Sequence, residues 1–94
     1  MQETPEEKAR TYLTSIEKVL GEMEFIKTSS GIDEERVRNI VDHVHSYAED
    51  AKYYLQDRPS TALAAISYAE GLLDALKFLG LVKFMWPGSR DERR

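Results

Sequence analysis

The segment from Ser46 to Leu81 contains two apolar helical patterns joined by a break at Asp57, Arg58 and Pro59. Apolar residues that recur every three or four positions form one face of an α-helix. Pro59 ends the first pattern, because proline has no backbone N–H and its ring clashes with the preceding turn. The segment therefore predicts a helical hairpin, and a tight turn forces its two helices to pack side by side.

The sequence before the hairpin predicts another amphipathic helix, from about residue 5 to residue 27. Thr4 can cap its start, Pro5 suits the first helical position, and Glu7 completes a capping box. Its apolar residues follow the helical period: Ala9, Tyr12, Leu13, Ile16, Val19, Leu20, Met23 and Ile26.

Asp33 is positioned to cap a second helix, which we expect over residues 33–58. Ile32 and Val37 have the spacing of a hydrophobic staple across its first turn. This helix is the longest that the sequence predicts.

The third helix is expected over residues 60–80 and is apolar on most of its circumference. Gly71 interrupts it at a cost in helix propensity, which favours a close crossing with a neighbouring helix. Gly80 suits a left-handed C-terminal stop that folds Leu81 back towards Leu76.

The predicted fold is therefore all-α: an antiparallel three-helix bundle that contains the hairpin and forms a single domain over residues 1–94. A short tail, residues 81–94, follows the third helix. Helices joined by short loops pack as antiparallel neighbours.

Composition limits the functional classes. The chain is 41% hydrophobic and 32% charged, which is typical of a folded soluble protein, and no apolar run approaches the roughly 20 residues of a membrane span. It has no cysteine and no secretion signal, so we expect a cytoplasmic location without disulfides or thiolate metal sites. A net charge of -4 disfavours nucleic acid as the main partner.

Asp42, His45 and Glu49 share one helix face at the spacing of a carboxylate and imidazole metal site. A bundle site would need matching ligands from other helices, and no second histidine is suitably placed. We therefore expect a solvated helix edge, with no metal and no cofactor.

Arg38 and His43 form an Arg-x4-His run that resembles the motif of HEPN ribonucleases, in which histidine serves as acid or base on an RNA phosphate. In that family the motif follows the hairpin, whereas here it precedes it. The resemblance supplies an alternative function, a HEPN-like RNA-directed protein or the helical companion of a nucleotidyltransferase.

Four aromatic or sulfur-containing side chains form a candidate interaction surface: Tyr53, Phe84, Met85 and Trp86. Tyr53 departs most from the apolar stripe of its helix and should be exposed. The other three either cap the open end of the bundle or contact a partner.

The hairpin sequence resembles a small archaeal family of helical proteins, catalogued as domain of unknown function 357. The resemblance covers nearly the whole chain and is most specific in the Tyr-Ala-x-Gly-x-Leu-Asp-Ala run from Tyr68 to Ala75. It implies an all-helical, intracellular archaeal protein with no established activity. The hairpin also resembles a tetratricopeptide unit, with Ala48, Tyr54 and Ala62 at matching positions.

The function that we expect is a non-enzymatic protein-interaction module. Its partner would be another protein or a second copy of the chain, a homodimer being one such assembly. The alternative is the RNA-directed role at Arg38 and His43.

Overall fold

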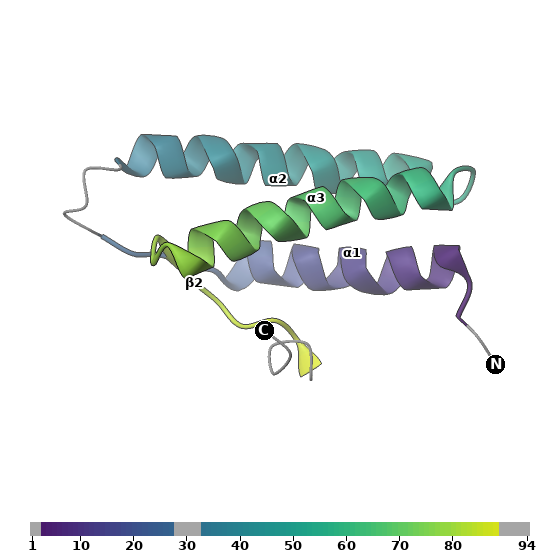
Figure 1. Cartoon of the computed structure of the whole chain (residues 1–94), viewed down its shortest axis with the longest axis horizontal. Coiled ribbons are helices and arrows are strands. Elements are labelled where there is room, and N and C mark those ends of the chain that lie inside the picture. The colour runs from purple at the N-terminus through teal and green to yellow at the C-terminus, as the bar shows by residue number, and fades with distance from the viewer. Residues whose placement is uncertain (1–2, 28–32, 89–94) are drawn as a thin grey trace.

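The computed structural model describes residues 3–27 and 33–88, which fold into three helices and a short antiparallel ribbon. Helix α1 spans Pro5–Glu22, α2 spans Glu34–Tyr54 and α3 spans Pro59–Phe78. Strand β1, Glu24–Phe25, follows α1, and strand β2, Val82–Lys83, follows α3. The helices run in alternating directions (Figure 1). The predicted all-α three-helix bundle is confirmed.

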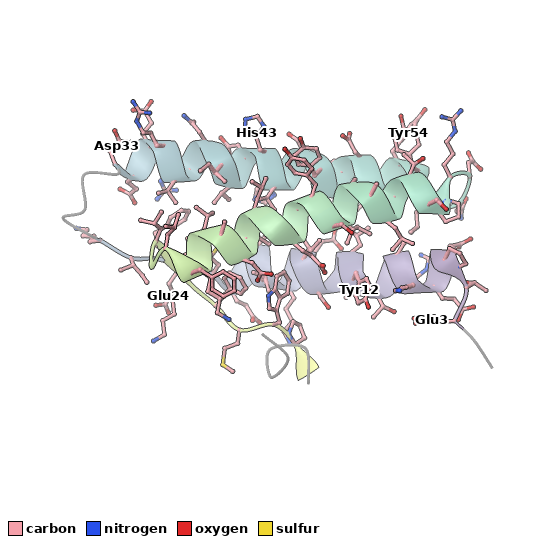
Figure 2. All side chains as sticks on the ribbon, viewed as in Figure 1. Glu3, Tyr12, Glu24, Asp33, His43 and Tyr54 are labelled. Carbon is pink, nitrogen blue, oxygen red and sulfur yellow. The ribbon has the colours of Figure 1, made fainter. Side chains whose placement is uncertain are left out.

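Helix α3 packs against both α1 and α2, which contact each other less than they contact α3 (Figure 1). Side chains from the three helices and the C-terminal tail form one core (Figure 2). Its buried residues are Ala9, Leu13, Ile16, Val19, Val37, Val41, Val44, Ala48, Ala51, Leu55, Ala62, Ile66, Ala69, Leu73, Leu76, Leu81, Val82, Phe84 and Trp86.

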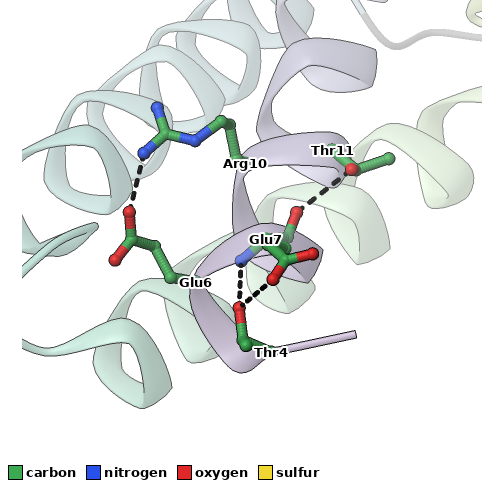
Figure 3. A network of polar contacts seen from close by, with 5 residues as sticks. All are labelled: Thr4, Glu6, Glu7, Arg10 and Thr11. Carbon is green, nitrogen blue, oxygen red and sulfur yellow. Dashed lines mark hydrogen bonds and ion pairs between the residues drawn. The ribbon is translucent and has the colours of Figure 1, made fainter. Parts of the chain in front are cut away.

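Both N-caps that the sequence predicts are formed. Thr4 Oγ1 accepts a hydrogen bond from the Glu7 N–H at 3.1 Å, and the Thr4 hydroxyl donates to the Glu7 carboxylate at 3.0 Å (Figure 3). The Asp33 carboxylate accepts a hydrogen bond from the Arg36 N–H at 2.8 Å. These bonds satisfy N–H groups that have no partner within their own helix, and so they define where α1 and α2 begin.

Helix α1 ends at Glu22 rather than near residue 27. Met23 adopts extended backbone, and its N–H donates to the Val19 carbonyl at 2.8 Å. The predicted helical positions of Met23 and Ile26 are therefore wrong, because the chain leaves the helix here to pair with the tail.

The ribbon formed by β1 and β2 is antiparallel and was not predicted. Glu24 lies opposite Lys83, and Phe25 lies opposite Val82. Beyond this register, the Ile26 N–H donates to a tail carbonyl at 3.0 Å. Strands of two residues are too short to produce the alternating pattern by which strands are recognised in a sequence.

Helix α2 ends at Tyr54 rather than near residue 58. The Leu55 N–H donates to the Lys52 carbonyl at 3.4 Å, which tightens the last turn, and the Arg58 N–H donates to the Tyr54 carbonyl at 2.8 Å. Pro59 is the first residue of α3, a position whose N–H would have no partner within the helix, so the missing N–H of proline costs no hydrogen bond. The predicted tight break between the two helices is confirmed.

The C-terminal stop of α3 is formed as predicted. Gly80 has a φ of 75°, its N–H donates to the Lys77 carbonyl, and the Leu81 N–H donates to the Leu76 carbonyl, both at 3.0 Å. These two bonds define a Schellman motif, and the hydrophobic residues at its two ends, Leu76 and Leu81, are buried. The chain consequently reverses and places the tail against the bundle.

The tail supplies the largest fully buried side chain, Trp86, which is 2% exposed. Its Nε1–H donates to Asp74 Oδ1 on α3 at 2.8 Å, and its ring meets that of Phe84 edge to face with centroids 5.2 Å apart. The Lys77 Nζ atom lies over the Phe84 ring, 4.9 Å from its centroid. The tail therefore closes the flank of α3.

Gly71 does not mark a close crossing between helices of this chain, and that prediction is wrong. It is exposed, and a Cβ added at this position would meet no atom within 4 Å. Ala64 and Ala75, which share its line along α3, are exposed as well. Small residues on a helix that is apolar on most sides do not by themselves show which side is buried.

Two predictions lie outside the described residues. They are the staple that involves Ile32 and the course of the tail from residue 89 to 94. In the part of the chain that the structure describes, no helix has the length and apolar content needed to cross a membrane.

Replacing Trp86 with alanine should lower the free energy of unfolding by about 3–5 kcal/mol, because it opens a cavity and leaves Asp74 without the indole N–H. Met85, which is 74% exposed next to it, serves as the control, and Met85→Ala should change stability by less than about 0.5 kcal/mol. Urea denaturation followed by circular dichroism measures both. Equal stability of the two variants would show that Trp86 is not a core residue.

Alanine at the two glycines of the α3 region should have opposite effects. Gly71→Ala should raise the free energy of unfolding by up to about 1 kcal/mol, since alanine favours a helix and the position is open. Gly80→Ala should lower it by about 1 kcal/mol, because φ is positive there. Thermal denaturation would test the pair, and a stabilising Gly80→Ala would contradict the assigned stop.

Candidate interaction surface

The solvent-exposed side of α3 carries no charged side chain. Every residue of α3 is described, and the exposed ones, which we name the α3 open face, are Ser60, Thr61, Ala64, Ser67, Tyr68, Gly71, Ala75 and Phe78. The charged residues of this helix, Glu70, Asp74 and Lys77, are half-buried on the flank where the tail packs.

The other two helices are exposed in a different way. Charged residues predominate on the exposed positions of α2, which include Glu34, Glu35, Arg36, Arg38, Asp42, Glu49, Asp50 and Lys52. On α1 the exposed charged residues are Glu7, Lys8, Arg10, Glu17, Lys18 and Glu22. The α3 open face therefore differs from the rest of the helical surface in charge and not only in apolar content.

The α3 open face has two aromatic residues among smaller ones, Tyr68 near the middle of the helix and Phe78 at its C-terminal end. Tyr68 stacks on Tyr47 of α2, with ring centroids 4.7 Å apart, so its position is held by a neighbouring helix. Phe78, at the C-terminal end, is 71% exposed, and Leu79 continues the apolar surface beyond it. Gly71 lies between them with open space over its backbone. The result is an uncharged surface of mostly small residues with two exposed aromatic side chains.

Two of the four residues predicted to form an interaction surface are buried. Phe84 and Trp86 belong to the core and pack along the flank of α3, so of their two predicted roles the exposed contact with a partner is wrong. Tyr53 is 81% exposed on the last turn of α2, and Met85 is exposed on the tail. Met85 lines a cavity with Val19, near the end of α1, so the structure places it and Tyr53 towards opposite ends of the bundle.

The structure does not bring Arg38 and His43 onto one concave surface. Residues five apart on a helix point about 140° away from each other. Arg38 faces β1, where its guanidinium lies 4.4 Å from the Phe25 ring centroid and pairs with Glu34 at 3.1 Å. His43 points outward from α2 (Figure 2). The cavity that Arg38 lines does not include His43.

Asp42, His45 and Glu49 are all exposed along α2. Among residues 3–27 and 33–88, no three histidine, cysteine, aspartate or glutamate side chains converge on a position that could hold a metal ion. The geometry of the described residues therefore gives the metal interpretation no support.

Two neighbouring cavities of about 280 and 290 Å³ lie between α1 and α2 and share Leu20 and His45 in their walls. Lys52 links the helices beside them, with its Nζ 2.9 Å from Glu17 and 3.7 Å from Glu49. The hydrogen bond and the charge of Glu17, followed by the charge of Glu49, raise the pKa of Lys52 above its ordinary 10.5. The charged groups at this rim are thus paired within the chain, unlike the uncharged α3 open face.

The α3 open face was not predicted, because Gly71 was expected to lie at a close crossing with a neighbouring helix. The positions of the charged residues in α3 nevertheless indicate this surface. Glu70, Asp74 and Lys77 fall on one flank when α3 is drawn as a helix, so the remaining circumference is free of charge. A helix buried on one side only would then expose an uncharged surface.

The fold and surface define a small all-α protein, a three-helix bundle whose third helix is open on its outer side. The chain belongs to the DUF357 family, described as proteins of unknown function, whose family model matches residues 11–82. This confirms the resemblance seen in the sequence. The match includes all of α2 and α3 and therefore the whole α3 open face.

Comparisons with curated proteins and with solved structures found no match. The tetratricopeptide and HEPN resemblances and the archaeal origin stay predictions.

Proposed function

We propose that this chain is a non-enzymatic protein-interaction module and that the α3 open face is its docking surface. The observation that supports the proposal is the absence of charge from the exposed side of α3, a helix whose every residue is described. The centres of protein interfaces are depleted in charged residues and enriched in aromatic ones. A surface that shows both features favours a protein partner.

The energetics of this surface also favour docking. Tyr68 is 59% exposed, and it and Phe78 offer aromatic area of the kind that anchors interfaces. Complete burial of an exposed phenylalanine side chain contributes roughly 1.5–3 kcal/mol. Docking here desolvates no ion, a cost that would otherwise offset the gain.

The α3 open face is also presented rigidly. Helix α3 is fixed on its inner side by α1 and α2, and Tyr47 holds the exposed ring of Tyr68. A partner would consequently order little of this chain on binding, which reduces the entropic cost of association. Trp86 contributes indirectly, because its hydrogen bond to Asp74 fixes the flank of the helix.

A glutamate at Gly71 would test the proposal. It places a charge at the middle of the α3 open face, and the backbone has room for the side chain. Gly21→Glu is the matched control, because Gly21 is an exposed helical glycine of α1 with equally open surroundings. Glutamate favours a helix over glycine, so both variants should fold.

The measurement is the amount of protein that co-purifies in stoichiometric ratio with the tagged full-length chain from its native lysate. The wild-type chain and Gly21→Glu should retain the same partner, and Gly71→Glu should retain about tenfold less, as expected when a charge is buried unpaired. Equal retention by both glutamate variants would overturn the proposal. A co-purifying RNA that is lost when Arg38 is replaced would instead favour the RNA-directed alternative.

A further inference from the structure

We propose that the partner docked on the α3 open face is a second copy of this chain, with the two α3 helices antiparallel and crossing at Gly71. This inference rests on the proposed function and names its partner. It would give a two-fold symmetric dimer, in which each copy uses the same surface.

The order of residue sizes along α3 makes the surface complementary to itself. Positions four and seven residues to either side of Gly71 lie on the same face of a helix. They are occupied by Ser67 and Ala75 at four residues and by Ala64 and Phe78 at seven. In an antiparallel pair centred on Gly71, each Phe78 ring meets the partner's Ala64, and each Ser67 meets the partner's Ala75. Each Phe78 thus faces a small residue, and Ser67, Gly71 and Ala75 leave room for the two helices to approach closely between the Phe78 rings.

Charge also selects this surface for contact between copies. In a two-fold contact a surface meets itself, so an excess of one charge sign would repel, and each copy has a net charge of -4. The exposed positions of α1 and α2 carry many charged groups, whereas those of α3 carry none. Among the described helices, α3 is therefore the one whose exposed side a second copy can cover without desolvating exposed charged groups or bringing like charges together.

The available area sets the strength of the dimer. A 20-residue helix is about 30 Å long and about 10 Å wide, which gives a footprint of about 300 Å² on each copy. Leu79 extends it at one end. The two copies together would bury about 600 Å², which is below the roughly 1,200 Å² that stable interfaces bury in total. We therefore expect a weak dimer whose population rises with protein concentration.

Single cysteines test the geometry directly, because the chain contains no cysteine of its own. In the antiparallel dimer, Gly71→Cys places two thiols at the crossing point. Ser67→Cys places its thiol about 12 Å along the helices from its counterpart, beyond the roughly 4.4–6.8 Å between Cα atoms that a disulfide spans. Gly21→Cys, on α1, is the exposed control.

Each full-length variant would be checked for helicity, oxidised at about 100 µM and resolved by non-reducing electrophoresis. Gly71→Cys should form at least about tenfold more disulfide dimer than Ser67→Cys or Gly21→Cys. A mixture of Ser67→Cys and Ala75→Cys should form the mixed disulfide in preference to either homodimer. Equal cross-linking of Ser67→Cys, Gly71→Cys and Ala75→Cys would indicate a parallel pair and overturn the antiparallel arrangement.

Sedimentation of the wild-type chain separates the failure of this inference from failure of the proposed function. A monomer at all concentrations up to about 1 mM, without cross-linking of Gly71→Cys, would overturn the second copy as partner. Loss of a different co-purifying protein from Gly71→Glu would then still support docking on α3. If Gly71→Glu lost no partner either, both proposals would fall.

Discussion

The packing of α3 against both α1 and α2 is the constraint on which the rest of the structure depends. Its inner side combines small and large buried residues, which fit between two helices that contact each other little: Ala62, Ile66, Ala69, Leu73 and Leu76. Each large side chain buried in this way contributes roughly 1.5–3 kcal/mol. The stop at the end of α3 then returns the chain to the bundle, so that the tail covers the flank that the other helices leave open.

This arrangement also explains the exposed surface. Neighbours cover α3 on its inner side and along the flank where the tail packs, and its charged residues are half-buried on that flank. The outer side is left with small and aromatic residues only. The same helix therefore supplies the centre of the core and the surface proposed for docking, so a partner would contact the most firmly held element of the bundle.

The sequence predicts most of the fold because its helices have clear apolar periods and local end signals. Thr4, Asp33 and Gly80 act through bonds within a few residues, and the two caps and the stop are formed as predicted. Pro59 lies at the predicted break, but it begins α3 and does not end α2. The ribbon depends instead on pairing between segments far apart in the chain, which local patterns do not encode. The candidate surface was predicted less well. The burial of Phe84 and Trp86 depends on where the tail packs. The exposure of Gly71 depends on which side of α3 the other helices cover.

The measurement that tests the account most directly is the concentration dependence of the amide NMR spectrum of the wild-type chain. The central claim is that the outer side of α3 is open in the single chain and is covered when a second copy of the chain binds. We predict that the signals of Ser67, Gly71 and Ala75 shift progressively as protein concentration rises through the micromolar range, while those of His43 and Asp50 on α2 do not. Shifts confined to α2, or no shift at any concentration, would contradict the claim.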